Sequence, residues 1–232
     1  MTDRDAPCLL ILETSGRVAS VALAEGGRLL GTRRLDEARR HARDLAPAVA
    51  GLLAGQGWRP RDVHAVLVGR GPGSYTGLRV GVMSAKAFAY ATGCALLALD
   101  TFAAIALQAP AGCDRLDVLA DAQQDRVYFQ PFARAGGAWR PLEGLAIVPV
   151  AEWLARRGPN AWATGPGLKK WEDRLPPEAR RVEETERDPR PASLLHLGLA
   201  RYRAGERDDV WSVEPLYLRP SSAEEQWQSR GQ

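Results

Sequence analysis

The stretch G-R-G-P-G-S-Y-T-G, from Gly69 to Gly77, is a glycine-rich loop between two regular elements. The apolar run before it, residues 63–68, predicts a buried strand. The run after it, residues 76–92, predicts a helix that ends at Gly93. A strand, a glycine-rich turn and a helix start together expose backbone N–H groups, which can bind an anion. The loop therefore indicates an α/β fold.

Two interpretations of this loop stay open. The motif lacks the lysine of a P-loop, and it also lacks the flanking glycines of a nucleophile elbow around Ser74. It can be a tight structural turn, which glycine permits. It can also be a site of nucleotide or phosphate contact, in which case the contacting residues in the loop are Gly71, Gly73 and Ser74.

The segments around the loop complete the N-terminal half. Apolar runs predict strands over residues 8–12, 18–24 and 29–35, and the third is polar enough to lie near an edge. Leu45, Val49, Leu52 and Leu53 fall on one face of a helix. A further strand follows the loop helix over residues 95–99. The order β-β-β-α-β-α-β predicts parallel strands added to an antiparallel hairpin.

The C-terminal half is less regular. Strands are predicted over residues 116–120, 126–132 and 161–164, with another inside 139–148. Helices are predicted over 150–157 and 193–204, and the charged, proline-rich stretch 176–191 is expected to be a surface loop. We expect an N-terminal lobe at 1–102 and a smaller C-terminal lobe with a polar tail at 103–232.

The helix after the loop carries small residues at every fourth position, namely Gly77, Gly81, Ala85 and Ala89. Residues four apart lie on one helix face, and a small-residue face lets another element approach closely. Glycine inside a helix costs about 0.5–1 kcal/mol relative to alanine, so a packing reason is expected. Close packing within the fold and a helix–helix interface between subunits both stay open.

Glu13 ends the first strand and is followed by Thr14 and Ser15. An acid at this place can hold a metal–phosphate or orient a water, or it can serve only as a hydrogen-bonding cap. His41 lacks a second histidine at helical spacing, because Leu45 stands four residues later. No metal site is predicted.

Composition limits the class of protein. With 45% hydrophobic and 25% charged residues, the 232-residue chain is an ordinary globular one. A net charge of +3 is too small to indicate a nucleic-acid surface. The cysteines are odd in number and form no C-x-x-C pair, and we see neither a signal peptide nor a membrane span. We expect a cytoplasmic protein without membrane contact.

Three segments together resemble the TsaB family, also called YeaZ: LLILETSGRVASVAL, GRGPGSYTGLRVG and EPLYLRP. They occur in order between Leu9 and Pro220, and DAQQDRVYF, beginning at Asp121, resembles a further family segment. The resemblance implies an actin-like ATPase fold (Hsp70, sugar kinase and actin architecture) with two lobes, each a mixed sheet flanked by helices.

The resemblance also implies a function. TsaB-like proteins support a TsaD-like catalytic subunit, beside a TsaE-like ATPase, in the transfer of threonylcarbamoyl to the adenosine next to the anticodon of tRNA. They self-associate through helices of the N-terminal lobe, which implies an interface of Gly77, Gly81, Ala85 and Ala89 with His41, Leu45 and Val49. A homodimer, indirect contact with tRNA, no tightly bound cofactor and ATP at the level of the complex are all expected.

The prediction is therefore a non-catalytic scaffold or dimerisation subunit, whose activity alone is left uncertain. TsaD-like enzymes carry a metal-binding histidine pair, and here only His41 aligns with it. The family usually has Asp where this chain has Glu13. An active ATPase or phosphotransferase of the same fold is the alternative, and a metallopeptidase is a third hypothesis that the lack of ligands disfavours.

Overall fold

This computed structural model describes residues 6–35 and 41–218 of the chain. Their regular elements, in chain order, are β1 (Cys8–Glu13), β2 (Ser20–Glu25), β3 (Arg28–Arg34), α1 (His41–Gly55), η1 (Pro60–Asp62), β4 (Ala65–Gly71), α2 (Tyr75–Thr92), β5 (Ala95–Asp100), α3 (Thr101–Ala106), β6 (Arg115–Asp121), β7 (Arg126–Ala135), β8 (Ala138–Pro141), β9 (Ala146–Pro149), α4 (Val150–Arg156), β10 (Trp162–Thr164), α5 (Leu168–Trp171), η2 (Glu172–Arg174), η3 (Glu184–Glu186) and α6 (Pro191–Arg203).

The first lobe is built on a five-stranded sheet with the order β3-β2-β1-β4-β5. β1 pairs antiparallel with β2 and parallel with β4, which confirms the predicted combination of hairpin and parallel strands. β3 lies at the edge, as its polar residues predicted. β1 is buried on both faces, because Leu10 packs in the cluster with α1 and α2 while Ile11 packs in the cluster with α6. That explains its unbroken apolar sequence.

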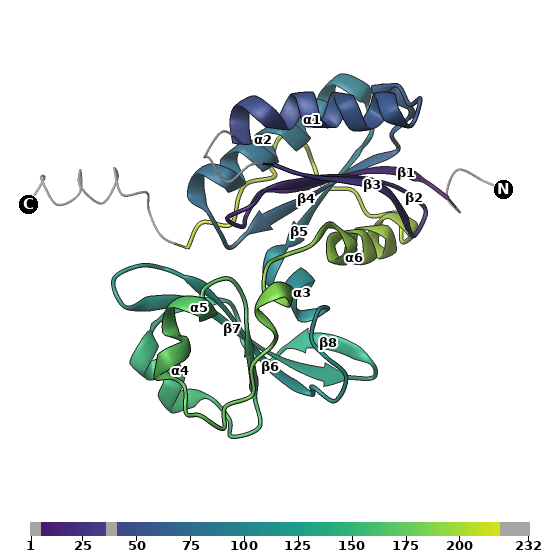
Figure 1. The fold of residues 1–232 in the computed structure, drawn as a ribbon. Helices are drawn as coiled ribbons and strands as arrows, with labels where there is room; N and C mark the ends of the chain where they lie inside the picture. Colours follow the sequence, from purple (N-terminus) through teal and green to yellow (C-terminus); the bar gives the residue numbers. More distant parts are fainter. Residues whose placement is uncertain (1–5, 36–40, 219–232) are drawn as a thin grey trace, which may run out of the picture.

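Helices cover both faces of this sheet, with α1 and α2 on one side and α6 on the other (Figure 1). α2 begins where the Ser74 hydroxyl accepts a hydrogen bond from the Gly77 N–H, and it ends at Gly93 in the left-handed conformation. The end at Gly93 confirms the prediction, since glycine is a favoured C-cap. The helix begins one residue earlier than predicted, because Ser74 is its N-cap.

The second lobe holds a second sheet, ordered β10-β6-β7-β8, with β9 also paired to β7. The single strand predicted within residues 139–148 is two strands, β8 and β9, because residues 142–145 between them are not in strand conformation. The short helix α3 was not predicted. It connects the lobes directly after β5 (Figure 1).

The structure corrects the expected division at residue 102. Helix α6 lies under the first sheet, where its Leu194 and Leu199 pack with Leu9 and Leu67. Gly198 lets this helix approach closely, since a Cβ there would lie 2.5 Å from Cδ1 of Leu67. The chain therefore crosses to the second lobe and returns, and the C-terminal helix belongs to the first lobe.

The stretch 176–191 is also more than the surface loop that was predicted. Arg187 in this stretch is buried, and its guanidinium donates to the Val182 carbonyl and pairs with Glu172. These contacts fix the segment that leads back to α6. Among the helices of residues 6–35 and 41–218, none has the length and apolarity needed to cross a bilayer.

Candidate functional site

The end of β1 is a buried polar turn. Glu13 and Thr14 are fully buried and Ser15 nearly so. One carboxylate oxygen of Glu13, Oε1, accepts hydrogen bonds from the Ser15 backbone N–H at 2.6 Å and from the Ser15 hydroxyl. The other oxygen, Oε2, has no partner within the described chain. Burial raises the pKa of Glu13 above its usual value, although the bonds from Ser15 oppose that rise.

The glycines of the loop and of α2 close over this turn. A Cβ at Gly69 would lie 2.3 Å from Glu13 Oε2, and one at Gly77 would lie 2.0 Å from the Thr14 carbonyl oxygen. At Gly81 it would lie 2.1 Å from the Thr14 hydroxyl. Real side chains do not approach this closely, so each of these positions needs glycine.

This packing corrects the predicted subunit interface. Gly77, Gly81, Ala85 and Ala89 are all buried within the chain, on the side of α2 that faces the sheet. The small-residue face therefore serves internal packing, which was the other interpretation that the spacing allowed.

The α1 residues of the predicted interface are also in part core residues. Leu45 is buried and Val49 is partly buried in the core shared by α1, α2 and the sheet. They contribute to the fold. The side chain of His41 lies outside the described residues.

Backbone amides of the glycine-rich loop donate hydrogen bonds to neighbouring groups of the chain. The Ser74 N–H donates to the Ser15 carbonyl at 2.8 Å, and the Gly71 N–H donates to the Thr101 hydroxyl at 3.2 Å. The Gly77 N–H is bound by the Ser74 side chain. The structure thus brings Glu13, Thr14 and Ser15 together with Gly73 and Ser74, as a contact site would require. In this conformation, however, the amides of Gly71, Ser74 and Gly77 are occupied, which favours the tight-turn interpretation.

A cavity of about 350 Å³ opens between the lobes beyond this turn. Its wall from the first lobe is Arg17, and its walls from the second include the Gly165–Gly167 turn and Lys170. Lys170 forms an ion pair with Asp121 at 2.9 Å. Two more lining residues are also paired, Lys169 with Glu184 and Arg187 with Glu172. The sequence did not predict this cavity, because its lining residues come from four separate segments of the chain.

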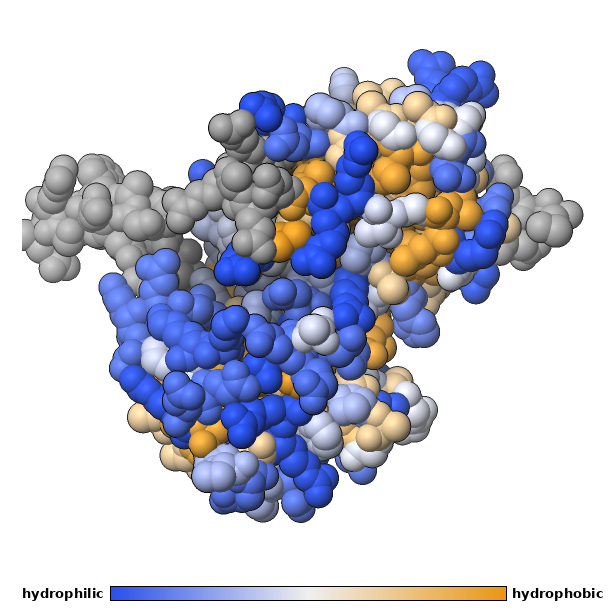
Figure 2. Space-filling model, in the orientation of Figure 1, coloured by the Kyte–Doolittle hydropathy of each residue, from blue (hydrophilic) through white to orange (hydrophobic). Residues whose placement is uncertain are grey.

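The outer side of α2 exposes large apolar side chains. Met83 is 60% exposed, Tyr90 is 69% exposed, and Trp211 from the C-terminal segment is 75% exposed. The rings of Tyr90 and Trp211 meet edge to face at 5.5 Å. We call Met83, Tyr90 and Trp211 the α2 docking face. Figure 2 shows the contrast between the lobes from one side, since orange residues gather on the first lobe while the second is mostly blue.

The C-terminal segment is fixed on α2 by polar and aromatic contacts. Lys86 Nζ donates to the Val213 carbonyl at 2.9 Å. Arg79 lies 4.4 Å from the ring centre of Tyr75 and donates to the Tyr217 hydroxyl at 3.2 Å, while the Tyr75 and Tyr217 rings lie 4.7 Å apart. These contacts hold the segment that contains Trp211 in place, and so they pre-organise the docking face.

The docking face was missed at the sequence level. Met83 and Tyr90 are seven residues apart, which is the spacing of one helix face, but the small-residue stripe was the stronger signal. Trp211 lies far away in sequence among charged residues. Only its solvent exposure in the fold reveals it.

Comparison with known proteins identifies relatives that cover nearly the whole chain. A family model described as TsaD, tRNA N6-adenosine threonylcarbamoyltransferase, matches residues 35–227. The tRNA threonylcarbamoyladenosine biosynthesis protein TsaB of Escherichia coli is 28% identical over 93% of this chain and 96% of its own length. YeaZ from Pseudomonas aeruginosa is 29% identical, with a TM-score of 0.78 over 91% of this chain and all of that one.

Substitution of Gly81 by alanine tests the packing of α2 on the β1 turn. The added Cβ would overlap the Thr14 hydroxyl, so we expect a loss of roughly 1–3 kcal/mol of unfolding free energy. Gly55→Ala is the matched control, because its Cβ would meet no atom within 4 Å. Thermal unfolding measures both. An unchanged melting temperature for Gly81→Ala would contradict this account of the stripe.

Glu13→Gln tests the cost of the buried carboxylate. Because burial raises the pKa of Glu13, its charged form is disfavoured in the fold. Stability is then fully present below the ordinary pKa near 4.5 and is lost as the pH rises through the raised value. At about pH 8 we expect the neutral glutamine to raise the melting temperature by about 2–8 °C, which is about 1–2 kcal/mol. Equal stabilisation at acid and alkaline pH would refute the explanation.

Proposed function

We propose that this chain is a non-catalytic subunit in the synthesis of threonylcarbamoyladenosine in tRNA. It belongs to the family of TsaD, the tRNA N6-adenosine threonylcarbamoyltransferase. It is also homologous to TsaB over nearly its whole length. In this proposal it binds a TsaD-like catalytic subunit, which carries out the transfer. A TsaE-like ATPase joins the complex, any ATP acts at that level, and tRNA is contacted through the partners. The site of action is the cytoplasm.

The observation that carries the proposal is the α2 docking face. An exposed cluster of aromatic and sulfur-containing side chains is characteristic of protein interfaces, where Tyr, Trp and Met are enriched. Met83, Tyr90 and Trp211 lie on a surface held by Lys86 and the Tyr75–Tyr217 contact. A rigid apolar surface loses little conformational entropy on binding, which favours a stable complex.

The closed turn at the end of β1 supports the non-catalytic part. Oε2 of Glu13 lies against Gly69 and has no access to solvent, since Glu13 is fully buried. A carboxylate in that position cannot reach a metal–phosphate group without movement of the loop. Catalysis therefore falls to the partner in this proposal.

A homodimer through the same face is a further part of the proposal. The surface is apolar enough to pair with a second copy, and a TsaD-like partner would then displace that copy. The two assemblies compete for the same residues, so each excludes the other at Tyr90 and Trp211.

The alternative is an ATPase or phosphotransferase of the actin-like fold, which the cavity between the lobes favours. Its test is ATP turnover by the purified chain alone. Turnover that Arg17→Ala abolishes would replace the scaffold proposal with this one, and turnover at the background level would count against the alternative.

Tyr90→Glu and Trp211→Glu test the docking face directly. Each places a charge in an apolar contact, so we expect binding to the host's TsaD-like protein to weaken by about 30-fold or more. Isothermal titration calorimetry measures the affinity, and light scattering follows self-association. The melting temperature should fall by only a few degrees, about 1 kcal/mol or less, because both side chains are exposed and each variant loses only the Tyr90–Trp211 ring contact.

Leu142→Glu is the matched control, since Leu142 is 47% exposed on the second lobe. It should leave the affinity for the TsaD-like protein unchanged. Wild-type affinity in both docking-face variants would contradict the proposed interface.

A further inference from the structure

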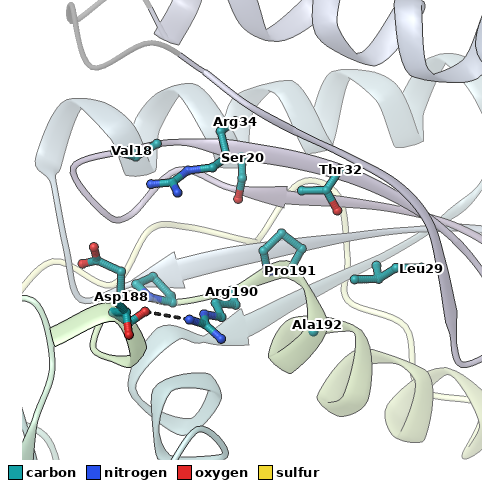
Figure 3. Close-up of a pocket in the computed structure, with 11 residues that line it drawn as sticks. Val18, Ser20, Leu29, Thr32, Arg34, Asp188, Arg190, Pro191 and Ala192 are labelled. Atoms are coloured by element: carbon teal, nitrogen blue, oxygen red, sulfur yellow. Dashed lines mark hydrogen bonds between the residues drawn. The ribbon is translucent and has the colours of Figure 1, made fainter. Parts of the chain in front are cut away.

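A second cavity of about 400 Å³ lies between the edge of the first sheet and the segment that leads into α6. Strands β2 and β3 form one wall, and residues 185–192 form the other. Figure 3 shows the side chains of Ser20 and Thr32 pointing from the sheet toward Pro191. This cavity is separate from the one between the lobes, although Asp188 borders both.

The strand register gathers polar groups on this wall. Ser20 pairs with Arg34, and Ala22 pairs with Thr32, so these side chains share the face of the sheet that α6 covers. Ser20 is only 6% exposed, and its side chain lines the cavity. Within residues 6–35 and 41–218 its hydroxyl oxygen is not one of the fully buried atoms that lack a partner, so it is open to the cavity, where it can donate a hydrogen bond to a ligand.

The charges on the lining favour an anion. Arg190 is already bound to the Thr185 carbonyl and to Glu186. In the described part of the chain the Arg34 side chain makes no ion pair or hydrogen bond, so its guanidinium can donate hydrogen bonds to an oxyanion in the cavity. The remaining lining includes Leu29 and Pro191, which are apolar.

The start of α6 adds a second attraction. Pro191 has no N–H, and the amides of Ser193 and Leu194 both donate to the Arg190 carbonyl. The Ala192 N–H lies in the first turn of this 13-residue helix, at its positive end, where backbone N–H groups have no acceptor within the helix itself. Asp188 is the carboxylate on this lining and opposes an anion from the rim.

We propose that this cavity binds a small organic oxyanion, a phosphate monoester or a carboxylate. Its anionic group lies between Arg34 and the first turn of α6, and it accepts hydrogen bonds from the hydroxyls of Ser20 and Thr32. Its carbon body packs on Leu29 and Pro191. The ligand stabilises the junction between the edge strands and the returning segment, and its binding is independent of the α2 docking face.

Titration calorimetry of the full chain with inorganic phosphate, glycerol 3-phosphate and L-malate tests the proposal. Binding by glycerol 3-phosphate alone identifies a phosphate ester, and binding by malate alone identifies a carboxylate. Arg34→Ala should weaken the affinity by about tenfold or more, since it removes a charge-assisted contact. Arg33→Ala is the matched control, because Arg33 is the next residue on β3 and points to the opposite face.

Two more variants sharpen the result. Ser20→Ala should weaken binding and leave the melting temperature of the ligand-free protein unchanged or higher, because the hydroxyl has no internal partner to lose. Asp188→Asn should strengthen binding by removing the repulsion at the rim. Absence of binding by all three probes at millimolar concentration, or equal losses in Arg33→Ala and Arg34→Ala, would overturn the proposal.

Discussion

Helix α2 lies unusually close to the end of β1, and this contact determines how the first lobe packs. Gly77 and Gly81 allow the helix to lie against Thr14, at distances that no side chain tolerates. The same contact buries Glu13 and closes the glycine-rich loop through the Ser74–Ser15 hydrogen bond. With one side of α2 occupied in this way, its other side is left at the surface, where Met83 and Tyr90 are exposed.

Much of this architecture could be predicted from local sequence signals. Apolar runs located the strands of the first sheet, and Gly93 marked the end of α2. Spacing alone, however, identifies a helix face without identifying what covers it. That is why Gly81 and Ala85 were compatible both with a subunit interface and with internal packing. Only the position of Thr14, which is far from α2 in sequence, decides between these two interpretations.

Contacts between segments that are far apart in sequence could not be predicted either. Helix α6 was predicted as an element, but its place under the first sheet depends on contacts such as Gly198 with Leu67. The docking face depends on the same return, because Trp211 reaches Tyr90 only after α6 has brought the chain back. Both cavities combine residues from distant segments, such as Ser20 with Pro191, so no local sequence pattern predicts them.

The two surfaces proposed for binding lie on opposite layers of the first lobe, one on α2 and one beside α6 (Figure 1). The α2 docking face is the surface at which we place the TsaD-like partner. Hydrogen–deuterium exchange of this chain, alone and mixed with the host's TsaD-like protein, tests it most directly. We expect slower exchange on mixing at residues 79–90 and 209–217, with the residues around Lys170 unaffected. Protection confined to the cavity between the lobes, or none in α2, would contradict it.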